Sequence, residues 1–398
     1  MSEIRLRVMV IGAGLGGLCL AQGLRRRGVD VTVYERDDAL LVRNQGYRLY
    51  IDPTGDRVLR ESLPAELYEL FRATAGYPPL RIVKLDDQLN ETRVLEDDPD
   101  ETPISVDRLT LRQILFEGLS DHVVFGKKLV RYETSEAGDG PVTAHFADGT
   151  TATGDVLVAA DGVNSVVRQQ YLPHARIMDS GVRQVYGKVP LNADTLGLFP
   201  DVMFNVFTPL VGSRERYMGI GPHQLNEPVA QAAARLAPGT ELHDTGDFLA
   251  CYFGARVERF PHDDLRSLTS PELHALALDM TKDWHPRLRT IIEHWLPDAV
   301  FPLTLRTSVP IPAWPTSRVT LLGDAIHTMS PAGGAGANTA LRDAGALTEA
   351  LGRAAAGAPL IPELRTYEAD MTEYGFAAVR ESAKDGAERY HANPLPTV

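Results

Sequence analysis

Residues 8–36 read VMVIGAGLGGLCLAQGLRRRGVDVTVYER, and this stretch decides the fold of the N-terminal region. The apolar run 8–11 is typical of a buried central strand, and the glycines after it have the Gly-x-Gly-x-x-Gly spacing. In such a turn the first glycine permits a tight bend, the second lets backbone approach a pyrophosphate, and the third lets the helix pack against the strand. The pattern predicts a helix over about 15–27, ended by Gly28, and a second strand over 29–34. We expect a dinucleotide to be bound by Gly12, Gly14, Leu15, Gly16 and Gly17.

Glu35 ends the second expected strand, roughly 20 residues beyond the glycines. An acidic side chain at this position binds the 2′- and 3′-hydroxyls of an adenosine ribose. A lone glycine motif is weak evidence, but between two strands and followed by Glu35 it indicates a dinucleotide with a free ribose 2′-hydroxyl. FAD and NAD both fit these residues.

The chain has 398 residues, enough for two or three domains, with 44% hydrophobic and 23% charged residues, as in ordinary globular proteins. Its formal charge of −13 argues against nucleic acid or an anionic membrane as a partner, since both would repel it. Cys19 and Cys251 lie far apart in the sequence, so we expect no disulfide framework, no metal site and a reducing cytoplasm. No segment is expected to span a bilayer.

Three further segments before residue 175 are expected to contribute to the nucleotide site. Residues 46–51 alternate as a strand that carries Arg48, and a helical stretch begins at Asp107, with Arg108 in its first turn near the edge where a cofactor pyrophosphate would lie. A buried strand then ends in Asp161-Gly162, and we expect Asp161 to cap the helix that follows.

From about residue 175 to 300, strand-like runs dominate, with prolines between them. We expect strands over 182–189, 202–207, 216–220 and 247–253 and one helix over 270–283. Residues 80–102 also read as antiparallel strands, and the acidic run 96–101 as a solvated hairpin or loop. Together these segments predict a β-rich domain inserted into the nucleotide-binding one.

The segment 318–338 decides between the two dinucleotides. A buried strand over 318–322 leads into Gly323-Asp324, and a glycine-rich loop precedes the next helix. An aspartate at the carboxyl end of a central strand is placed to bind a polyol chain, which FAD has in its ribityl and NAD lacks. The helix N-terminus would stabilise the N1–C2=O edge of the isoalloxazine, which becomes anionic on reduction. NAD would leave Asp324 without a role, so we predict FAD.

With these motifs the chain resembles the class A single-component aromatic-hydroxylase flavoproteins, the group of para-hydroxybenzoate hydroxylase, salicylate hydroxylase and the tetracycline-inactivating monooxygenases. The resemblance extends over nearly the full length. It is carried, in the family's order, by the glycine turn with Glu35-Arg36, by Asp161-Gly162 with Ser165 and Arg168, and by Gly323-Asp324 with His327, Pro331 and the glycines.

The resemblance implies an α/β fold with a Rossmann-like, glutathione-reductase-type FAD-binding domain, an inserted β-rich substrate domain and a C-terminal helix. We expect the FAD-binding domain over 1–75, 103–174 and 301–362, the substrate domain over 76–102 and 175–300, and the C-terminal helix and tail over 363–398. Besides the first glycine turn, the predicted cofactor residues are Glu35, Arg36, Arg48, Arg108, Leu129, Asp161, Asp324, Pro331, Gly334, Gly336, Ala337 and Asn338.

The same resemblance implies a monooxygenase. NADPH or NADH would reduce FAD, O₂ would add at flavin C4a, and the hydroperoxide would transfer one oxygen to an aromatic or polyketide-like substrate. No side chain can be named as a general base, and a histidine at 327 beside a glycine loop is more often structural. Aromatic residues expected at the substrate are Tyr186, Phe204, Phe207 and Tyr217. The residues leave open hydroxylation, Baeyer–Villiger oxidation or epoxidation, and a monomer or a homodimer.

A second hypothesis keeps the fold but not the oxidation, with FAD as a structural prop in a non-redox cyclisation or in ligand sequestration. Other classes fit less well. A flavin halogenase would show Trp-x-Trp-x-Ile-Pro, which residues 310–315 do not, and a serine hydrolase would show a Gly-x-Ser-x-Gly elbow. A simple NAD dehydrogenase would explain residues 8–36 but not 323–338.

Overall fold

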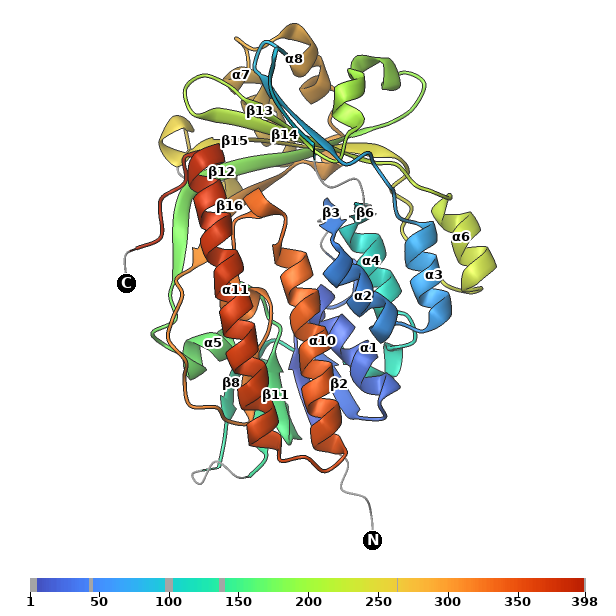
Figure 1. Ribbon diagram of the computed structural model, residues 1–398, viewed down its shortest axis with the longest axis vertical. Helices are drawn as coiled ribbons and strands as arrows, with labels where there is room; N and C mark the ends of the chain where they lie inside the picture. Colours follow the sequence, from blue (N-terminus) through green and yellow to red (C-terminus); the bar gives the residue numbers. More distant parts are fainter. Residues whose placement is uncertain (1–5, 43–45, 97–102, 136–139, 263, 397–398) are drawn as a thin grey trace.

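The computed structural model describes residues 6–42, 46–96, 103–135, 140–262 and 264–396 (Figure 1). The predicted N-terminal unit is confirmed: β1 (Arg7–Ile11) leads through the glycine turn into α1 (Leu15–Arg26), and β2 (Asp30–Tyr34) lies parallel to β1. The chain turns after α1 at Gly28, whose φ of 71° suits glycine.

β1 is the central strand of a five-stranded parallel sheet in the order β17-β11-β1-β2-β7. The other strands are β17 (Val319–Leu321), β11 (Val156–Ala159) and β7 (Val123–Val124). A three-stranded antiparallel sheet packs onto it, formed by β8 (Leu129–Glu133), β9 (Val142–Phe146) and β10 (Thr151–Gly154). The contact is close, because a Cβ on Gly154 would lie 2.8 Å from Met9 Cγ.

Helices complete this α/β layer. In front of the sheet, α10 (Gly336–Ala355) packs against α1, α2 (Pro53–Ser62) and α11 (Leu360–Tyr390), as Figure 1 shows. The remaining α-helices are α3 (Ala65–Ala73), α4 (Arg108–Phe116), α5 (Val166–Tyr171), α6 (Val229–Leu236), α7 (Ser270–Met280), α8 (Pro286–Glu293) and α9 (Asp324–His327). Within the described ranges, no helix combines the length and apolar character needed to cross a bilayer.

A second large sheet has seven strands in the order β16-β12-β15-β14-β13-β4-β5. Neighbouring strands are antiparallel except β13 and β4, which are parallel. The strands are β16 (Phe301–Ser308), β12 (Ile177–Pro190), β15 (Phe248–Arg256), β14 (Arg216–His223), β13 (Thr208–Val211), β4 (Arg81–Asp86) and β5 (Glu91–Glu96). A small two-stranded sheet, β3 (Arg48–Ile51) with β6 (Ile104–Asp107), lies between this sheet and the nucleotide-binding layer.

The two faces of the seven-stranded sheet have different partners, because side chains alternate along each strand. The outer face, with Val185, Met218 and Phe253, forms one hydrophobic core with α7 and α8. The opposite face carries Tyr186, Tyr217, Gly221, Ala250 and Tyr252, and we call it the inner face. It is directed toward β3 and the end of α11.

Several sequence predictions for this region need correction. Residues 202–207 are not a strand: Asp201–Phe204 form a 3₁₀ turn. Asn205 Nδ2 and Thr208 Oγ1 each donate to the Val202 carbonyl at 2.9 Å, which removes that carbonyl from strand pairing. The expected helix at 270–283 is α7, and α6 and α8 were not predicted. The acidic run after Glu96 lies outside the described residues.

The expected domain boundary at residue 300 falls directly before β16, which pairs with β12. The seven-stranded sheet therefore continues into residues that were assigned to the FAD-binding domain. Our division at residue 300 stays a proposal, and the pairing of β16 with β12 favours moving β16 to the inserted part.

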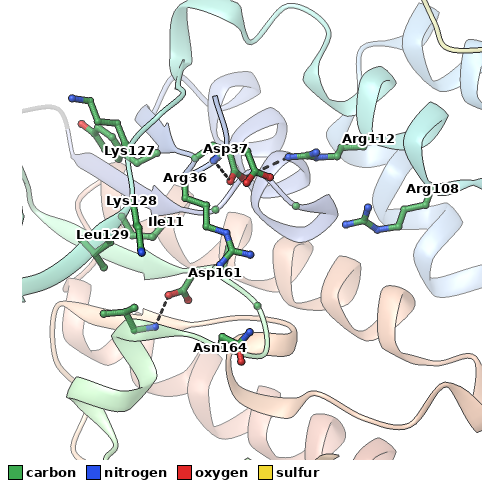
Figure 2. Close-up of a pocket in the computed structure, with 17 residues that line it drawn as sticks. Ile11, Arg36, Asp37, Arg108, Arg112, Lys127, Lys128, Leu129, Asp161 and Asn164 are labelled. Carbon is green, nitrogen blue, oxygen red and sulfur yellow. Dashed lines mark hydrogen bonds and ion pairs between the residues drawn. The ribbon is translucent and has the colours of Figure 1, made fainter. Parts of the chain in front are cut away.

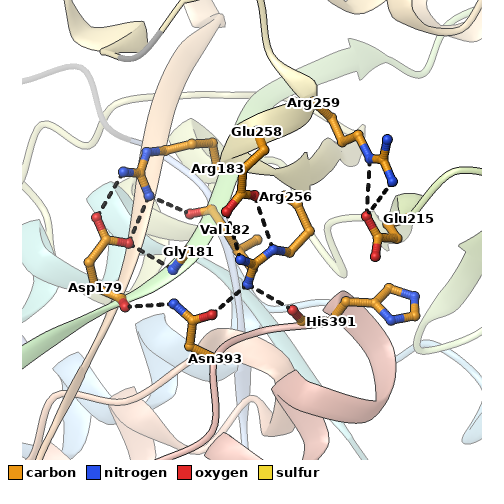
Figure 3. Close-up of polar contacts among 10 residues, drawn as sticks. All are labelled: Asp179, Gly181, Val182, Arg183, Glu215, Arg256, Glu258, Arg259, His391 and Asn393. Atoms are coloured by element: carbon orange, nitrogen blue, oxygen red, sulfur yellow. Dashed lines mark hydrogen bonds and ion pairs between the residues drawn. The ribbon is translucent and has the colours of Figure 1, made fainter.

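α11 runs from the nucleotide-binding layer to the inner face, where its last residue, Tyr390, stacks on Tyr217 with ring centroids 4.2 Å apart. The chain after it is tied to the sheet, as Figure 3 shows. Arg256 of β15 donates to the His391 carbonyl at 3.1 Å and to Asn393 Oδ1 at 2.7 Å. The end of the described chain therefore connects the two layers.

Candidate cofactor site

The three glycines of the first turn serve different purposes. Gly12 has a φ of 109°, and a Cβ there would lie 2.4 Å from the Ala160 carbonyl oxygen at the end of β11. A Cβ on Gly17 would lie 2.1 Å from the Gly12 carbonyl oxygen, so α1 packs directly on the turn. Around Gly14, the N-cap of α1, no described atom lies within 4 Å of such a Cβ, and no described side chain caps the helix. This end of α1 therefore offers N–H groups to an anion.

Glu35 is 6% exposed and holds the turn from the end of β2. One carboxylate oxygen accepts from the Ala13 N–H at 2.8 Å and lies 3.5 Å from Arg112 Nη2, and the other accepts from the Asp37 N–H at 3.0 Å. Arg112 also donates from Nε to the Ala13 carbonyl at 2.7 Å. These bonds fix the turn between β2 and α4 and orient the carboxylate beside the cavity.

The turn opens into a cavity of about 210 Å³ (Figure 2). It is lined by Ile11, Gly12, Gly14, Tyr34, Glu35, Arg36, Asp37, Arg108, Arg112, Lys127, Lys128, Leu129, Ala160, Asp161, Gly162, Asn164 and Val166. Five of these side chains are basic and three are acidic, although the whole chain has a formal charge of −13. This local excess of positive charge suits a pyrophosphate.

Asp161 follows β11 and faces Arg36 across the cavity in Figure 2. Its Oδ2 accepts from the Val166 N–H at 2.8 Å, while the N-cap of α5 is Ser165, which accepts from the Arg168 N–H. Asp161 and Ser165 therefore share the capping role expected of Asp161, because the turn places an oxygen of each side chain at the amino end of α5. Burial raises the pKa of Asp161.

Asp324 lies at the carboxyl end of β17, two strands from β1, and its side chain is exposed. Desolvation by the surrounding protein raises its pKa, and Arg108 is among the cations that oppose this rise. Arg108 also lines the cavity, and β17 pairs with β11, so Asp324 and the cavity lie at the same edge of the sheet. Arg168 joins the same edge by donating to the Ala325 carbonyl at 2.9 Å.

A buried network supports the Gly323-Asp324 turn from behind. Asp343 is fully buried; its Oδ2 accepts from the Gly323 N–H and bonds His327 Nε2, each at 2.6 Å, and its Oδ1 accepts from the Tyr374 hydroxyl at 2.6 Å. Although burial lowers the pKa of His327, Asp343 outweighs it, and the net pKa is raised. This arrangement supports the structural role expected for His327.

The loop after Asp324 is open where a flavin ring is expected. Pro331 and Gly334 are exposed, and Gly336 begins α10 without a described side-chain cap. Ala337 is half-buried, whereas Asn338 is buried and uses its side chain within the protein. Its Oδ1 accepts from the Asp52 N–H at 3.0 Å and its Nδ2 donates to the Tyr50 carbonyl at 2.9 Å.

Seven of the seventeen predicted cofactor residues line the cavity. Those that line the cavity are Gly12, Gly14, Glu35, Arg36, Arg108, Leu129 and Asp161. Leu15, Gly16 and Gly17 back the turn, and Gly16 faces Leu322 and α10. Arg48 lies apart from the cavity, against the seven-stranded sheet.

The four aromatic residues predicted at the substrate do not lie together. Tyr186 and Tyr217 are buried on the inner face, and Phe207 stacks near that face on Tyr252. Phe204 instead packs against the outer core, edge-on to Phe199, because the 3₁₀ turn directs it there. It is therefore not grouped with the other three.

Sequence reasoning missed several cavity residues. They include Asp37, Arg112, Lys127, Lys128, Asn164 and Val166. Arg112 could have been found, since it follows Arg108 by four residues and lies on the same side of α4. The lysines come from the connection to β8, and only folding places that connection beside the first turn.

These residues fit FAD. The uncapped helix end and the basic cavity suit its pyrophosphate, Glu35 lies where a ribose is expected, and Asp324 with the open loop suits its ribityl and ring. All three motifs meet at the carboxyl ends of adjacent strands β1, β11 and β17, where open α/β sheets bind nucleotides.

Known proteins share this organisation. A sequence model of the family described as FAD binding domain matches residues 5–220 and 304–382. Over 368 residues the chain is 33% identical to the dual O-methyltransferase/FAD-dependent monooxygenase CTB3 of Cercospora beticola, covering 86% of this chain and 42% of that protein. The chain thus spans less than half the length of that relative.

Two other relatives are covered almost completely. The chain is 30% identical over 415 residues to 3-amino-4-hydroxybenzoate 2-monooxygenase PtmB3 of Streptomyces platensis, covering 100% of this chain and 90% of that protein. A crystal structure described as a FAD containing monooxygenase from Photorhabdus luminescens superposes with a TM-score of 0.84 at 32% identity, covering 97% of this chain and 99% of that one. The chain therefore belongs to the FAD binding domain family, together with FAD-dependent monooxygenases, and FAD is its cofactor.

Proposed function

We propose that the chain is an FAD-dependent monooxygenase that uses NADPH or NADH and O₂ to oxygenate an aromatic or polyketide-like small molecule. The observation that carries this proposal is the meeting of the three FAD motifs at one sheet edge, below an inner face rich in aromatic side chains. The relatives' printed activities, one on a substituted hydroxybenzoate, support the same class of substrate.

Different residues of the chain would bind different parts of the cofactor. Arg36 and Arg108, with the amino end of α1, would neutralise the pyrophosphate. Glu35 would bind the ribose and Asp324 the ribityl. Bound FAD would supply the redox chemistry, accepting electrons from the nicotinamide and activating O₂. The seven-stranded sheet would cover the substrate and exclude water.

The test begins with the visible spectrum of the purified protein, where oxidised flavin absorbs at roughly 375 and 450 nm. NAD(P)H oxidation and O₂ uptake are then followed with a panel of phenols and polyketides. We expect flavin bands and ligand-stimulated oxidation. Flavin without stimulated oxidation would favour the non-redox hypothesis, and no flavin after adding FAD would refute the cofactor assignment.

Asp324→Ala provides the matching loss-of-cofactor variant. Because Asp324 is exposed, the variant should fold and yet purify with little FAD. A fully flavinylated variant would refute the ribityl role. We also propose a cytoplasmic protein, as a monomer or homodimer; sedimentation would decide between these two states.

A further inference from the structure

Arg48 is held where the small sheet meets the inner face. It begins β3, and its Nε donates to Ser105 Oγ at 3.0 Å and to the Pro222 carbonyl of β14 at 2.9 Å. Its guanidinium packs so closely on Gly221 that a Cβ there would lie 2.9 Å from Nη1. The group therefore has a defined place, and glycine at 221 leaves the room that it needs.

The positive charge of Arg48 has no counter-ion in the part of the chain that the structure describes. No carboxylate there forms an ion pair with it, and its Nη2 is buried without a hydrogen-bond partner. Asp107, its partner across the β3–β6 pair, directs Oδ1 to the N–H groups of Leu109 and Thr110 that begin α4. Burial lowers the pKa of Arg48 to about 10, so it stays a cation at neutral pH. The residue as a whole is half-buried, but its Nη2 is fully covered, and a covered cationic donor without a partner is costly. This indicates that an anion binds beside it.

Lys188, a second cation on the inner face, has different surroundings. Burial lowers the pKa of Lys188 and Asp107 opposes that shift, while its Nζ lies 4.8 Å from the centroid of the Phe248 ring. His223 is buried near both cations; burial first, then Arg48 and Lys188, lower its pKa to about 3, so it stays neutral. The surroundings of Arg48 therefore have a net positive charge.

Aromatic rings flank this charge. Tyr186 stacks on Phe301 with centroids 4.8 Å apart, and Tyr252 stacks on Phe207 at 6.1 Å. Tyr186 and Tyr252 both lie close enough to Arg48 to influence its pKa. The buried Tyr186 hydroxyl lies near the Arg48 backbone N–H, and its own proton has no described acceptor. Flat apolar surface beside an unpaired cation and a hydroxyl proton without an acceptor suits a ring that carries an anionic oxygen.

We propose, resting on the proposed function, that Arg48 binds an anionic oxygen of the substrate, either the carboxylate of an aromatic acid or the enolate of a polyketide-like ring. Such an oxygen accepts from the guanidinium and from the Tyr186 hydroxyl and satisfies both groups. Arg48 is then a specificity-determining residue of the substrate site, in place of the cofactor role expected from the sequence.

The test measures binding to the FAD-loaded protein by calorimetry, separately from turnover. The probes are salicylate, its neutral analogue salicylamide, and dimedone, a cyclic diketone that is an enolate at neutral pH. Arg48→Met removes the charge. It does not leave the Pro222 carbonyl without a partner, because Ser105 Oγ already donates to that carbonyl at 3.0 Å. Arg48→Lys keeps the charge, and Lys188→Met is the matched loss of a cation that lies over the Phe248 ring and near Asp107.

We expect Arg48→Met to weaken binding of salicylate or dimedone by about tenfold or more while salicylamide changes little. Arg48→Lys should lose less, and Lys188→Met least. Preference for carboxylate over enolate would identify which of the two anions is bound.

Four results would overturn the proposal. They are loss of FAD from Arg48→Met, an unchanged preference for anions in that variant, a larger loss in Lys188→Met, and no anion binding by the unmodified protein up to the solubility limit. Binding is measured without turnover, so the two proposals can fail separately. A negative binding result would refute the role of Arg48 but not the monooxygenase activity, and a lack of NAD(P)H oxidation would refute the activity but not the role of Arg48.

Discussion

The carboxylate of Glu35 at the dinucleotide end is paired within the protein, whereas the guanidinium of Arg48 on the inner face has no ion pair among the described residues. Glu35 accepts from two backbone N–H groups and lies beside Arg112, so the first turn is complete before FAD binds. On the inner face, Arg48 Nη2 is buried without a described partner, and the proton of the buried Tyr186 hydroxyl has no described acceptor. A site that always holds the same cofactor can be rigid, while a site for a passing substrate must leave its polar groups to the ligand.

Gly12→Ala is expected to have the largest effect on this contrast. Its Cβ would meet the Ala160 carbonyl at 2.4 Å in a backbone conformation with φ 109°, so we expect a loss of about 3 kcal/mol in unfolding free energy. Gly14→Ala is the control. It meets no described atom within 4 Å, so it should lose less than about 0.5 kcal/mol yet bind FAD at least about tenfold more weakly.

Denaturant unfolding of the apoprotein and FAD titration separate these two effects. If Gly12→Ala were as stable as Gly14→Ala, the prebuilt turn described for the cofactor end would be wrong.

Glu35→Ala tests the internal pairing directly. It leaves the Ala13 and Asp37 N–H groups and Arg112 without their carboxylate, and we expect a loss of about 2 kcal/mol even without FAD. Glu349→Ala, which removes the exposed ion pair with Arg27, should change the melting temperature little. Equal stability of the two variants would mean that Glu35 acts on the ligand alone.

Two buried histidines, His223 on the inner face and His327 near the cofactor end, allow the two regions to be compared by the pH dependence of stability. The pKa of His223 is lowered to about 3, so between pH 6.5 and 3 the unfolded chain binds more protons than the folded chain. The unfolding free energy therefore falls as pH decreases through that window, and at pH 5 it is lower by about 1 to 2 kcal/mol than at neutral pH. The pKa of His327 is raised beside Asp343, so its contribution is present below pH 6.5 and is lost as pH rises through the folded value.

Variants and NMR titration of the imidazoles check both signs. His223→Gln should reduce the loss of stability in acid, and His327→Gln should reduce the loss at higher pH. A pKa of His223 near 6.5 in the folded protein would mean that burial and the two neighbouring cations do not act on its imidazole as described.

Arg256→Ala is expected to have the smallest effect, since it breaks the tie between the layers and an ion pair with the exposed Glu258. The variant loses the bonds to the His391 carbonyl and Asn393, and we expect about 1 kcal/mol with faster proteolysis after α11 (Figure 3). Arg259→Ala, which breaks an exposed pair with Glu215, is the control and should cost no more than about 0.5 kcal/mol. An unchanged cleavage rate in Arg256→Ala would show that the other contacts, such as the Asn393 N–H bond to the Ser180 carbonyl, secure this end of the chain without Arg256.

The sequence alone determined the nucleotide-binding layer and its cofactor. Short motifs such as Gly12-x-Gly14-x-x-Gly17 and Gly323-Asp324 carry their own geometry, because strand, turn and helix follow one another within a few residues. Strand-to-helix order therefore predicted where these motifs meet.

The tertiary structure alone decided which distant side chains share the site. Lys127 and Arg112 reach the cavity through sheet order and helix packing, and Phe204 leaves the inner face because a 3₁₀ turn replaces the expected strand. The unpaired charge of Arg48 depends on Gly221, Pro222 and Ser105, which lie more than 50 residues from it along the chain. Such contacts come from packing between separate sheets, which local residue patterns do not encode.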